Sequence, residues 1–143
     1  MGVVLGIFIS NGGVPKLPVD SVQVKYEGLV GDDQHDKKHH GGVMRAVCVL
    51  ENEVLTKLQS EGHPITPGSA GENLLVEGFD LQSGSKIAIG DVELEVVSAA
   101  TPCKTIAASF TDGNFNRLSH KKNFGDTRWY CRVLKTGSIS IFN

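Results

Sequence analysis

The sequence predicts a mainly β protein whose strands close, or nearly close, into a β-barrel capped by a few short helices. Segments with strand alternation outnumber those with helical spacing by about four to one. The strand segments are short, and glycine-containing turns separate them at fairly even intervals, which is typical of a barrel. With 143 residues, 40% of them hydrophobic, the chain has enough material for one core. We therefore expect a single domain over residues 1–143.

Each expected strand is a short apolar or alternating segment bounded by turn residues. The clearest is 92–100, where Val92, Leu94 and Val96 alternate with two glutamates. It should end at Pro102, because proline has no N–H to donate to a sheet. The other expected strands are 3–9, 19–26, 44–50, 73–76, 85–89, 129–134 and 138–142.

Helical spacing is clearest over residues 51–62. Val54, Leu55 and Leu58 recur on one face there, and Gly62 follows as a typical helix terminator. A helix-compatible run, 104–110, follows Cys103, and a weaker polar one covers 112–124. These short helices are the expected caps of the barrel.

Composition excludes several classes of protein. The net charge is −2, and basic and aromatic residues do not interleave, so we expect no nucleic-acid partner. No apolar run approaches the roughly 20 residues of a membrane span, so no membrane association is expected. The three cysteines form no C-x-x-C pair, which favours a reducing, cytoplasmic location over a disulfide scaffold.

The first of three candidate binding loops is 28–42. It combines aspartates with His35, His39 and His40, residue types that suit zinc, although their spacing matches no standard zinc motif. A solvated surface loop is the better interpretation. The Gly41-Gly42 pair would let the backbone approach a ligand closely, with His40 as a hydrogen-bond donor.

The second candidate loop is 67–73. Its consecutive small residues can direct several backbone N–H groups at one anion, and Gly71 and Glu72 belong to this turn. The Asn73 amide offers both a donor and an acceptor to the edge of a heterocycle. An ordinary tight turn remains the alternative.

The third candidate loop places Cys103 directly after the strand 92–100. A cysteine at the start of a helix and beside Lys104 is well placed to act as a nucleophilic or metal-ligating thiolate. The alternative is a small buried residue in a strand–helix corner. For Cys48 and Cys131, which lie in apolar strands, core packing is the better interpretation.

Basic residues are few, and some of them adjoin these loops. Converging cations would suit a phosphate-bearing ligand. The alternative for the two late arginines is simple exposure on an edge strand. The four candidates are Arg45, Lys104, Arg128 and Arg132.

Taken in order, these segments resemble the MOSC domain, named for its place at the C-terminus of molybdenum cofactor sulfurases. The matching motifs cover nearly the whole chain, and together they are specific. They are Gly28-Leu29-Val30-Gly31-Asp32, His40-Gly41-Gly42 with Arg45-Ala46-Val47, Pro67-Gly68 with Gly71-Glu72-Asn73-Leu74, Pro102-Cys103-Lys104-Thr105, and Trp129-Tyr130 with Arg132-Val133-Leu134.

The resemblance implies a barrel like that of pyruvate kinase and a molybdopterin cofactor, with Cys103 as the molybdenum ligand. It also implies that residues of the matching loops grip the pterin and its phosphate. Those residues are His40, Gly41, Gly42, Arg45, Gly71, Glu72, Asn73, Lys104, Thr105, Arg128 and Arg132. No lysine is a candidate for a Schiff base, so pyridoxal phosphate, known from domains fused to this family, is not expected in this chain.

Three functions are compatible with these residues. The first is a small oxidoreductase that reduces N-hydroxylated compounds, with electrons from a separate redox protein. The second is a non-catalytic carrier that delivers the cofactor or its sulfur to an apo-molybdoenzyme; the absence of a fused catalytic domain motivates it. The third is thiol chemistry without molybdenum, in which His40 acts as base for Cys103.

Overall fold

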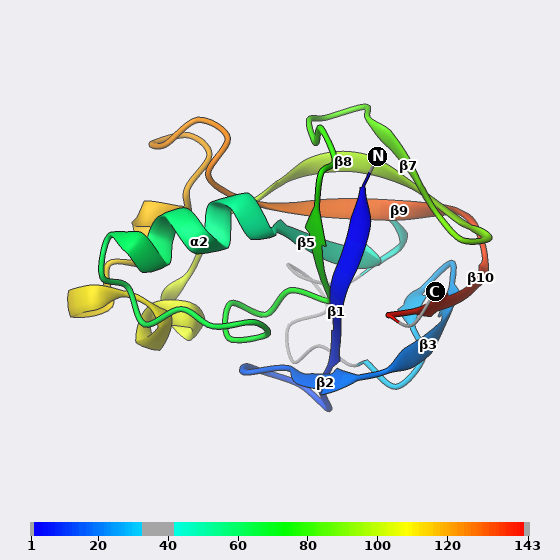
Figure 1. Ribbon diagram of the computed structural model, residues 1–143, viewed down its shortest axis with the longest axis horizontal. Coiled ribbons are helices and arrows are strands. Elements are labelled where there is room, and N and C mark those ends of the chain that lie inside the picture. Colours follow the sequence, from blue (N-terminus) through cyan, green and yellow to red (C-terminus); the bar gives the residue numbers. More distant parts are fainter. Residues whose placement is uncertain (1, 33–41, 142–143) are drawn as a thin grey trace.

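The computed structural model describes residues 2–32 and 42–141. Figure 1 shows long strands with the one described α-helix and several 3-10 turns gathered at one end of them. The strands are β1 (Val3–Ile9), β2 (Leu17–Val19), β3 (Ser21–Lys25), β4 (Gly28–Leu29), β5 (Val47–Glu51), β6 (Leu74–Glu77), β7 (Lys86–Ile89), β8 (Val92–Ala100), β9 (Arg128–Lys135) and β10 (Gly137–Ser140). The helical segments are η1 (Val43–Arg45), α2 (Asn52–Ser60), η2 (Lys104–Ser109), η3 (Thr111–Gly113) and η4 (Phe115–Leu118).

The described strands form two sheets. The larger has seven strands in the order β2-β1-β6-β5-β9-β8-β7, and the smaller has three in the order β10-β3-β4. Within these sheets β5 and β6 pair in parallel, and α2 connects them. The predicted mainly β class is therefore confirmed. The predicted closure into a barrel is not, because the described strands leave both sheets open at their edges.

Helix α2 begins after Glu51 and buries Val54, Leu55 and Leu58, as its spacing predicts. It ends in a Schellman motif: the Gly62 N–H donates to the Gln59 carbonyl and the His63 N–H to the Leu58 carbonyl. Gly62 has φ +95°, a conformation that strongly favours glycine. The prediction that Gly62 ends this helix is therefore confirmed, and its positive φ angle is the reason.

The expected helix over 104–110 forms, but as the 3-10 segment η2. The expected helix over 112–124 is divided into η3 and η4, with Asp112 at φ +57° inside the first. A 3-10 helix is the usual form of such short pieces, because its tighter turn needs few residues. No helix in the described part of the chain is long and apolar enough to cross a membrane.

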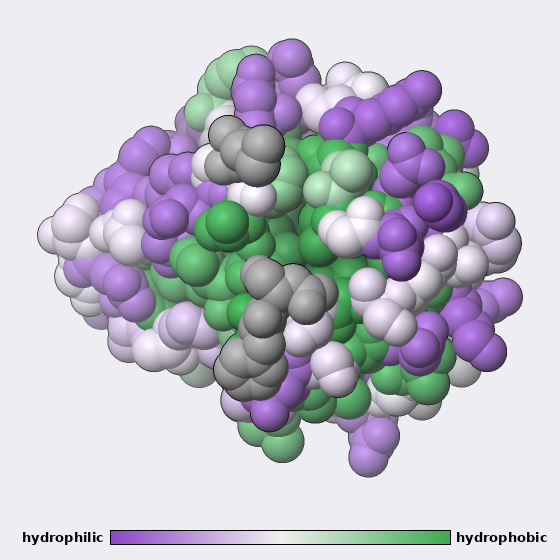
Figure 2. Space-filling model, turned by 45° about the vertical axis from the view of Figure 1, so that its right-hand side comes forward, coloured by the Kyte–Doolittle hydropathy of each residue, from purple (hydrophilic) through white to green (hydrophobic). Residues whose placement is uncertain are grey.

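The larger sheet separates two hydrophobic cores. On one face Trp129 and Cys131 pack with the small sheet, through Val22, Val24 and Ile139. The other face packs against α2 and η2–η4; the members of this second core include Phe8, Leu50, Leu58, Leu75, Ile106, Phe110 and Leu118. One side of the surface is also hollowed, with hydrophobic side chains in the hollow and hydrophilic ones around it (Figure 2).

Glu51, at the junction of β5 and α2, gives the fold a pH-dependent stability. Burial, together with the nearby carboxylates of Glu53, Asp80 and Asp126, raises the pKa of Glu51 to about 7 from its usual 4.5. The protonated form is thus favoured in the folded state. The contribution of protonated Glu51 to the free energy of unfolding is fully present below about pH 4.5 and is lost as the pH rises through about 7.

The variant Glu51→Gln, which stays neutral, should therefore be more stable than the wild type at pH 8 and equally stable at pH 4.5. Because Glu51 is partly exposed, we expect a gain of about 1–2 kcal/mol at pH 8, below the full value of its pKa shift. Thermal unfolding at both pH values measures this difference. The exposed Glu93→Gln is the control, and equal gains at pH 4.5 and pH 8 would contradict the assignment.

Candidate functional site

The candidate site lies on the face of the larger sheet that meets α2 and η2–η4, which we call the site face. Cys48 on β5 pairs across with Tyr130 on β9, and Tyr130 pairs with Ser98 on β8. Because directly paired residues lie on one face of a sheet, these side chains share the site face. There Cys48, Ala100 and Tyr130 form a small buried cluster of their own.

Strand β9 lines this face with a row of polar candidate side chains. Since successive side chains alternate between faces, Arg128, Tyr130 and Arg132 all lie on it. Arg128 is 5% exposed, whereas the Arg132 side chain is 43% exposed and its Nε donates to Glu95 Oε1 at 2.6 Å. β9 lies between β5 and β8. The alternative of an edge strand is therefore wrong, and of the two arginines only Arg132 is substantially exposed.

Cys103 lies just after the end of β8, where the chain leaves the site face. The strand ends at Ala100, before Pro102, as the sequence predicts. Cys103 precedes η2, its side chain is half-buried, and its Sγ lies 2.8 Å from Thr105 Oγ1. Thr105 and Lys104 are exposed. The thiol is thus accessible, and the alternative of a sealed core residue does not hold.

Arg128 joins the second and third candidate loops. Its Nη1 donates to the Ala70 carbonyl at 3.0 Å, and its Nη2 donates to the Thr101 carbonyl at 3.4 Å. Its buried Nε has no partner among the described residues. No described carboxylate forms an ion pair with it, although the buried Glu72 lies near enough to interact with it electrostatically.

Tyr130 and Arg45 complete the site face. The Arg45 guanidinium carbon lies 5.5 Å from the centroid of the Tyr130 ring, a cation–π distance. Burial raises the pKa of Tyr130 to about 12; Cys48 and Cys103 add to the rise, and Arg128 and Arg45 oppose it. The phenol therefore keeps its proton at neutral pH and can donate a hydrogen bond.

Glu72 is fully buried inside the second loop. Its Oε2 accepts a hydrogen bond from the Gly68 N–H at 2.8 Å, while its Oε1 has no partner among the described residues. Burial raises the pKa of Glu72, although backbone N–H groups and Arg128 oppose that rise. The predicted cradle of backbone N–H groups therefore holds a carboxyl group of the loop itself. Gly71, at φ +79°, forms the turn above Arg128.

Asn73 is also buried, and its described partners are internal. Its Oδ1 accepts from the Cys48 N–H at 2.9 Å, and its Nδ2 donates to the Phe8 carbonyl at 3.2 Å and to Asp32 Oδ2 at 2.9 Å. Asp32 also forms a buried ion pair with Lys16 at 2.9 Å. Asn73 thus ties β1, β5 and the start of the first loop together; a cofactor contact by Asn73 stays a prediction.

The first loop can be placed only at its two ends. His40 and Gly41 lie outside the described residues, as do the histidines of the zinc hypothesis. Gly42, at φ +95°, directly precedes η1, which carries Arg45. Within the ranges 2–32 and 42–141, no group of three or more ligating side chains is arranged to hold a metal ion.

Sequence reasoning missed Tyr130 and Cys48 as members of the site. In the sequence Tyr130 stands out only as part of a family motif, and the apolar strand around Cys48 predicts core packing. Cys48 is buried as expected, yet it packs with Tyr130 on the site face. The available signal was strand alternation, which places Tyr130 between two arginines on the same face.

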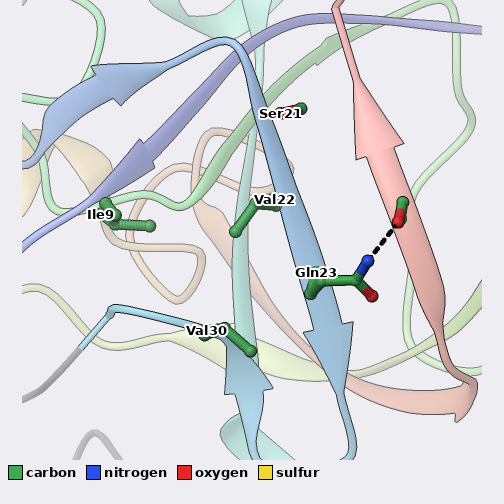
Figure 3. Close-up of a pocket in the computed structure, with 6 residues that line it drawn as sticks. Ile9, Ser21, Val22, Gln23 and Val30 are labelled. Atoms are coloured by element: carbon green, nitrogen blue, oxygen red, sulfur yellow. Dashed lines mark hydrogen bonds between the residues drawn. The ribbon is translucent and has the colours of Figure 1, made fainter.

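A separate recess of about 360 Å³ lies between β1, β3, β4 and β10 (Figure 3). The Ile9, Val22 and Val30 side chains line its apolar part, and Gln23 Nε2 donates to Ser138 Oγ at its edge. None of the predicted site residues lines it. The candidate site is therefore defined by the Cys103 environment and not by this recess.

The profile of the family described as MOSC domain matches residues 36–141. This range includes Cys103 and the side chains of Arg128, Tyr130 and Arg132 on β9. The chain belongs to the MOSC domain family. This family is associated with molybdenum cofactor binding. The predicted family is therefore confirmed.

Two curated proteins match most of this MOSC domain. The "Uncharacterized protein YflK" of Bacillus subtilis is 32% identical over 136 residues, 90% of this chain and 59% of that protein. "Protein YiiM" of Escherichia coli is 27% identical over 135 residues, 89% of this chain and 59% of that protein. The chain thus spans 59% of the length of each relative.

Solved structures show the same fold. YiiM from Geobacillus stearothermophilus has a TM-score of 0.69 at 21% identity, covering 99% of this chain and 72% of that one. The YUAD protein from Bacillus subtilis has a TM-score of 0.74 at 18% identity, covering 99% of this chain and 92% of that one. At these identities the likeness concerns the fold alone.

Proposed function

We propose that this MOSC domain binds a molybdenum–molybdopterin cofactor and reduces N-hydroxylated compounds, with Cys103 as the ligand of the metal. The observation that carries this proposal is the position of Cys103. Its accessible thiol lies just after the end of β8, close in the chain to the carbonyl of Thr101 that Arg128 on β9 contacts.

The residues present fit such a cofactor. A thiolate is the soft ligand that a dithiolene-bound metal prefers. The buried Arg128 has a free Nε and no described ion pair, while Arg132 is half-exposed farther along the same strand. A guanidinium without a carboxylate partner suits an anionic group such as a phosphate. The site therefore offers a soft ligand and anion-binding groups on a single face.

Each group then has a distinct role. Cys103 would hold the metal, and Arg45, Arg128 and Arg132 would hold the anionic part of the cofactor. Tyr130, protonated at neutral pH, would donate a hydrogen bond to the oxygen atom of the N–OH group of a bound substrate. When bound, the cofactor supplies two-electron oxygen-transfer chemistry. Overall, an N–OH group, two electrons and two protons give an N–H group and water, with electrons from a separate redox protein.

The test is molybdenum and pterin analysis of the chain expressed in a cofactor-competent host, followed by an assay of hydroxylaminopurine reduction with a chemical reductant. We expect about one molybdenum and one pterin per chain, and turnover that depends on both. A chain that retains neither would overturn the proposal. If the chain retained the cofactor without reducing hydroxylaminopurine, and transferred the cofactor to an apo-molybdoenzyme, the carrier function would be supported and the reductase function rejected.

A further inference from the structure

The loop 119–126, between η4 and β9, presents an aromatic side chain to solvent. Phe124 is 89% exposed, the largest exposed fraction among the described large hydrophobic residues. In Figure 1 this loop is orange and projects beyond α2. One exposed apolar residue is ordinary in itself. Phe124 differs from such residues because ring contacts and backbone hydrogen bonds support it and its loop.

Phe124 is the outer member of a row of three rings in contact that begins in the core. Its ring centroid lies 4.6 Å from that of His120, which lies 5.1 Å from the centroid of Trp129. Trp129 is 3% exposed. His120 is oriented by its Nδ1, which accepts the Gly125 N–H at 2.9 Å. The contact with His120 therefore links the exposed Phe124 ring to the core.

The backbone of the loop is held as well. The N–H groups of Lys122 and Asn123 both donate to the Ser119 carbonyl, at 3.1 and 2.7 Å. The Asn123 side chain donates to the Arg117 carbonyl at 3.2 Å. A loop that is ordered before binding loses little conformational freedom on binding. Pre-organised, exposed aromatic residues are characteristic of binding hot spots.

The charges on this loop favour an acidic partner. Lys121 and Lys122 are exposed beside Phe124. The nearby Asp126 carboxylate is neutralised by Lys57 at 2.8 Å and by Arg117 at 2.9 Å. Among the described charges of this loop, the two lysines are therefore the ones without an ion-pair partner, and they would attract and orient a protein with a negative surface.

The loop leads directly into the candidate site. Thr127, the residue after it, donates from Oγ1 to the Ala100 carbonyl at 3.4 Å, and Arg128 contacts the Thr101 carbonyl. Phe124 precedes Thr127 by three residues, which span at most about 11 Å. A protein bound at Phe124 would thus lie at the end of the sheet where β8 continues to Cys103.

From these observations we infer that loop 119–126 is the docking point of a small acidic electron-carrier protein. Phe124 enters an apolar recess of the carrier, and Lys121 and Lys122 face its carboxylates. The inference rests on the proposed reductase function, which needs an external source of electrons. Electron-transfer complexes are small, so one aromatic anchor with two charges is a sufficient core. An anionic membrane is less well suited, because two lysines contribute only about 2 kcal/mol there.

The test is an NMR titration of the ¹⁵N-labelled, metal-free chain with two probes, a purified flavodoxin and a purified [2Fe–2S] ferredoxin. We expect shift changes centred on residues 119–126 with at least one probe, and weaker binding as salt rises from 50 to 200 mM. Phe124→Ser should weaken binding about tenfold, the effect of losing a modest hot spot. The double variant Lys121→Gln/Lys122→Gln should weaken it mainly at low salt, whereas Lys135→Gln, an exposed lysine on β9, should not.

Shift changes elsewhere, or no salt-dependent binding to either probe, would overturn the inference. So would Phe124-dependent binding to vesicles of phosphatidylserine and phosphatidylcholine without binding to the carriers. Circular dichroism of Phe124→Ser checks that the fold is retained. Because the titration uses metal-free protein, its failure leaves the molybdenum proposal standing, while failure of the metal analysis leaves the docking result unaffected.

Discussion

Cys103→Ala should reduce the molybdenum retained by the purified chain by at least about tenfold, since even residues that only orient metal ligands change metal affinity 10–100-fold. Cys103 is half-buried at the end of β8, and its Sγ has one described polar neighbour, Thr105. Removing this thiol should therefore change the free energy of unfolding by less than about 1 kcal/mol. Elemental analysis and thermal unfolding of the same preparation separate the two effects.

The matched control is Cys131→Ala. Cys131 loses the same atom, but it lies in the core on the opposite face of the sheet. We expect normal molybdenum content and a modest loss of stability from the small cavity, about 1 kcal/mol. If Cys103→Ala kept the wild-type metal content, Cys103 would not be the ligand, and both the reductase and the carrier proposals would lose their basis.

Asn73→Ala should lower the free energy of unfolding by about 2–4 kcal/mol, because each buried polar group left without a partner costs about 1–3 kcal/mol. The Asn73 side chain accepts from the Cys48 N–H and donates to the Phe8 carbonyl and to Asp32. The buried Cys48 N–H and Phe8 carbonyl would each lose this partner, whereas Asp32 would keep its ion pair with Lys16. Urea unfolding measures the change, with the slope expected to stay constant.

Asn52→Ala provides the comparison for Asn73. The Asn52 side chain donates one hydrogen bond, to Glu77 Oε1 at 3.0 Å, at an exposed position. Water can replace that bond, so we expect a change below about 1 kcal/mol. Asn73→Asp should also destabilise, since it keeps the acceptor for Cys48 but brings a second carboxylate to Asp32. A loss below about 1 kcal/mol for Asn73→Ala would refute its role as a structural link.

The sequence is sufficient to locate most elements of this fold. Alternation over 92–96 predicts β8, Pro102 predicts its end, and Gly62 predicts the end of α2. Each of these signals is local: side-chain period, a missing N–H or a positive φ angle acts within a few residues. The position of Cys103 after β8 follows from the same local signals, which is why the sequence identifies it.

Tertiary structure alone decides which way the remaining candidates face. Arg128 is buried because β9 lies between β5 and β8, and its guanidinium reaches carbonyl groups 58 and 27 residues away in the chain. Glu72 and Asn73 point inward to Gly68 and Cys48, although a motif of the same residues could equally face a ligand. The sequence by itself determined most of the elements and the position of Cys103 at the end of a strand, because their causes are local. The orientation of the surrounding polar groups depended on partners that only the folded chain brings together.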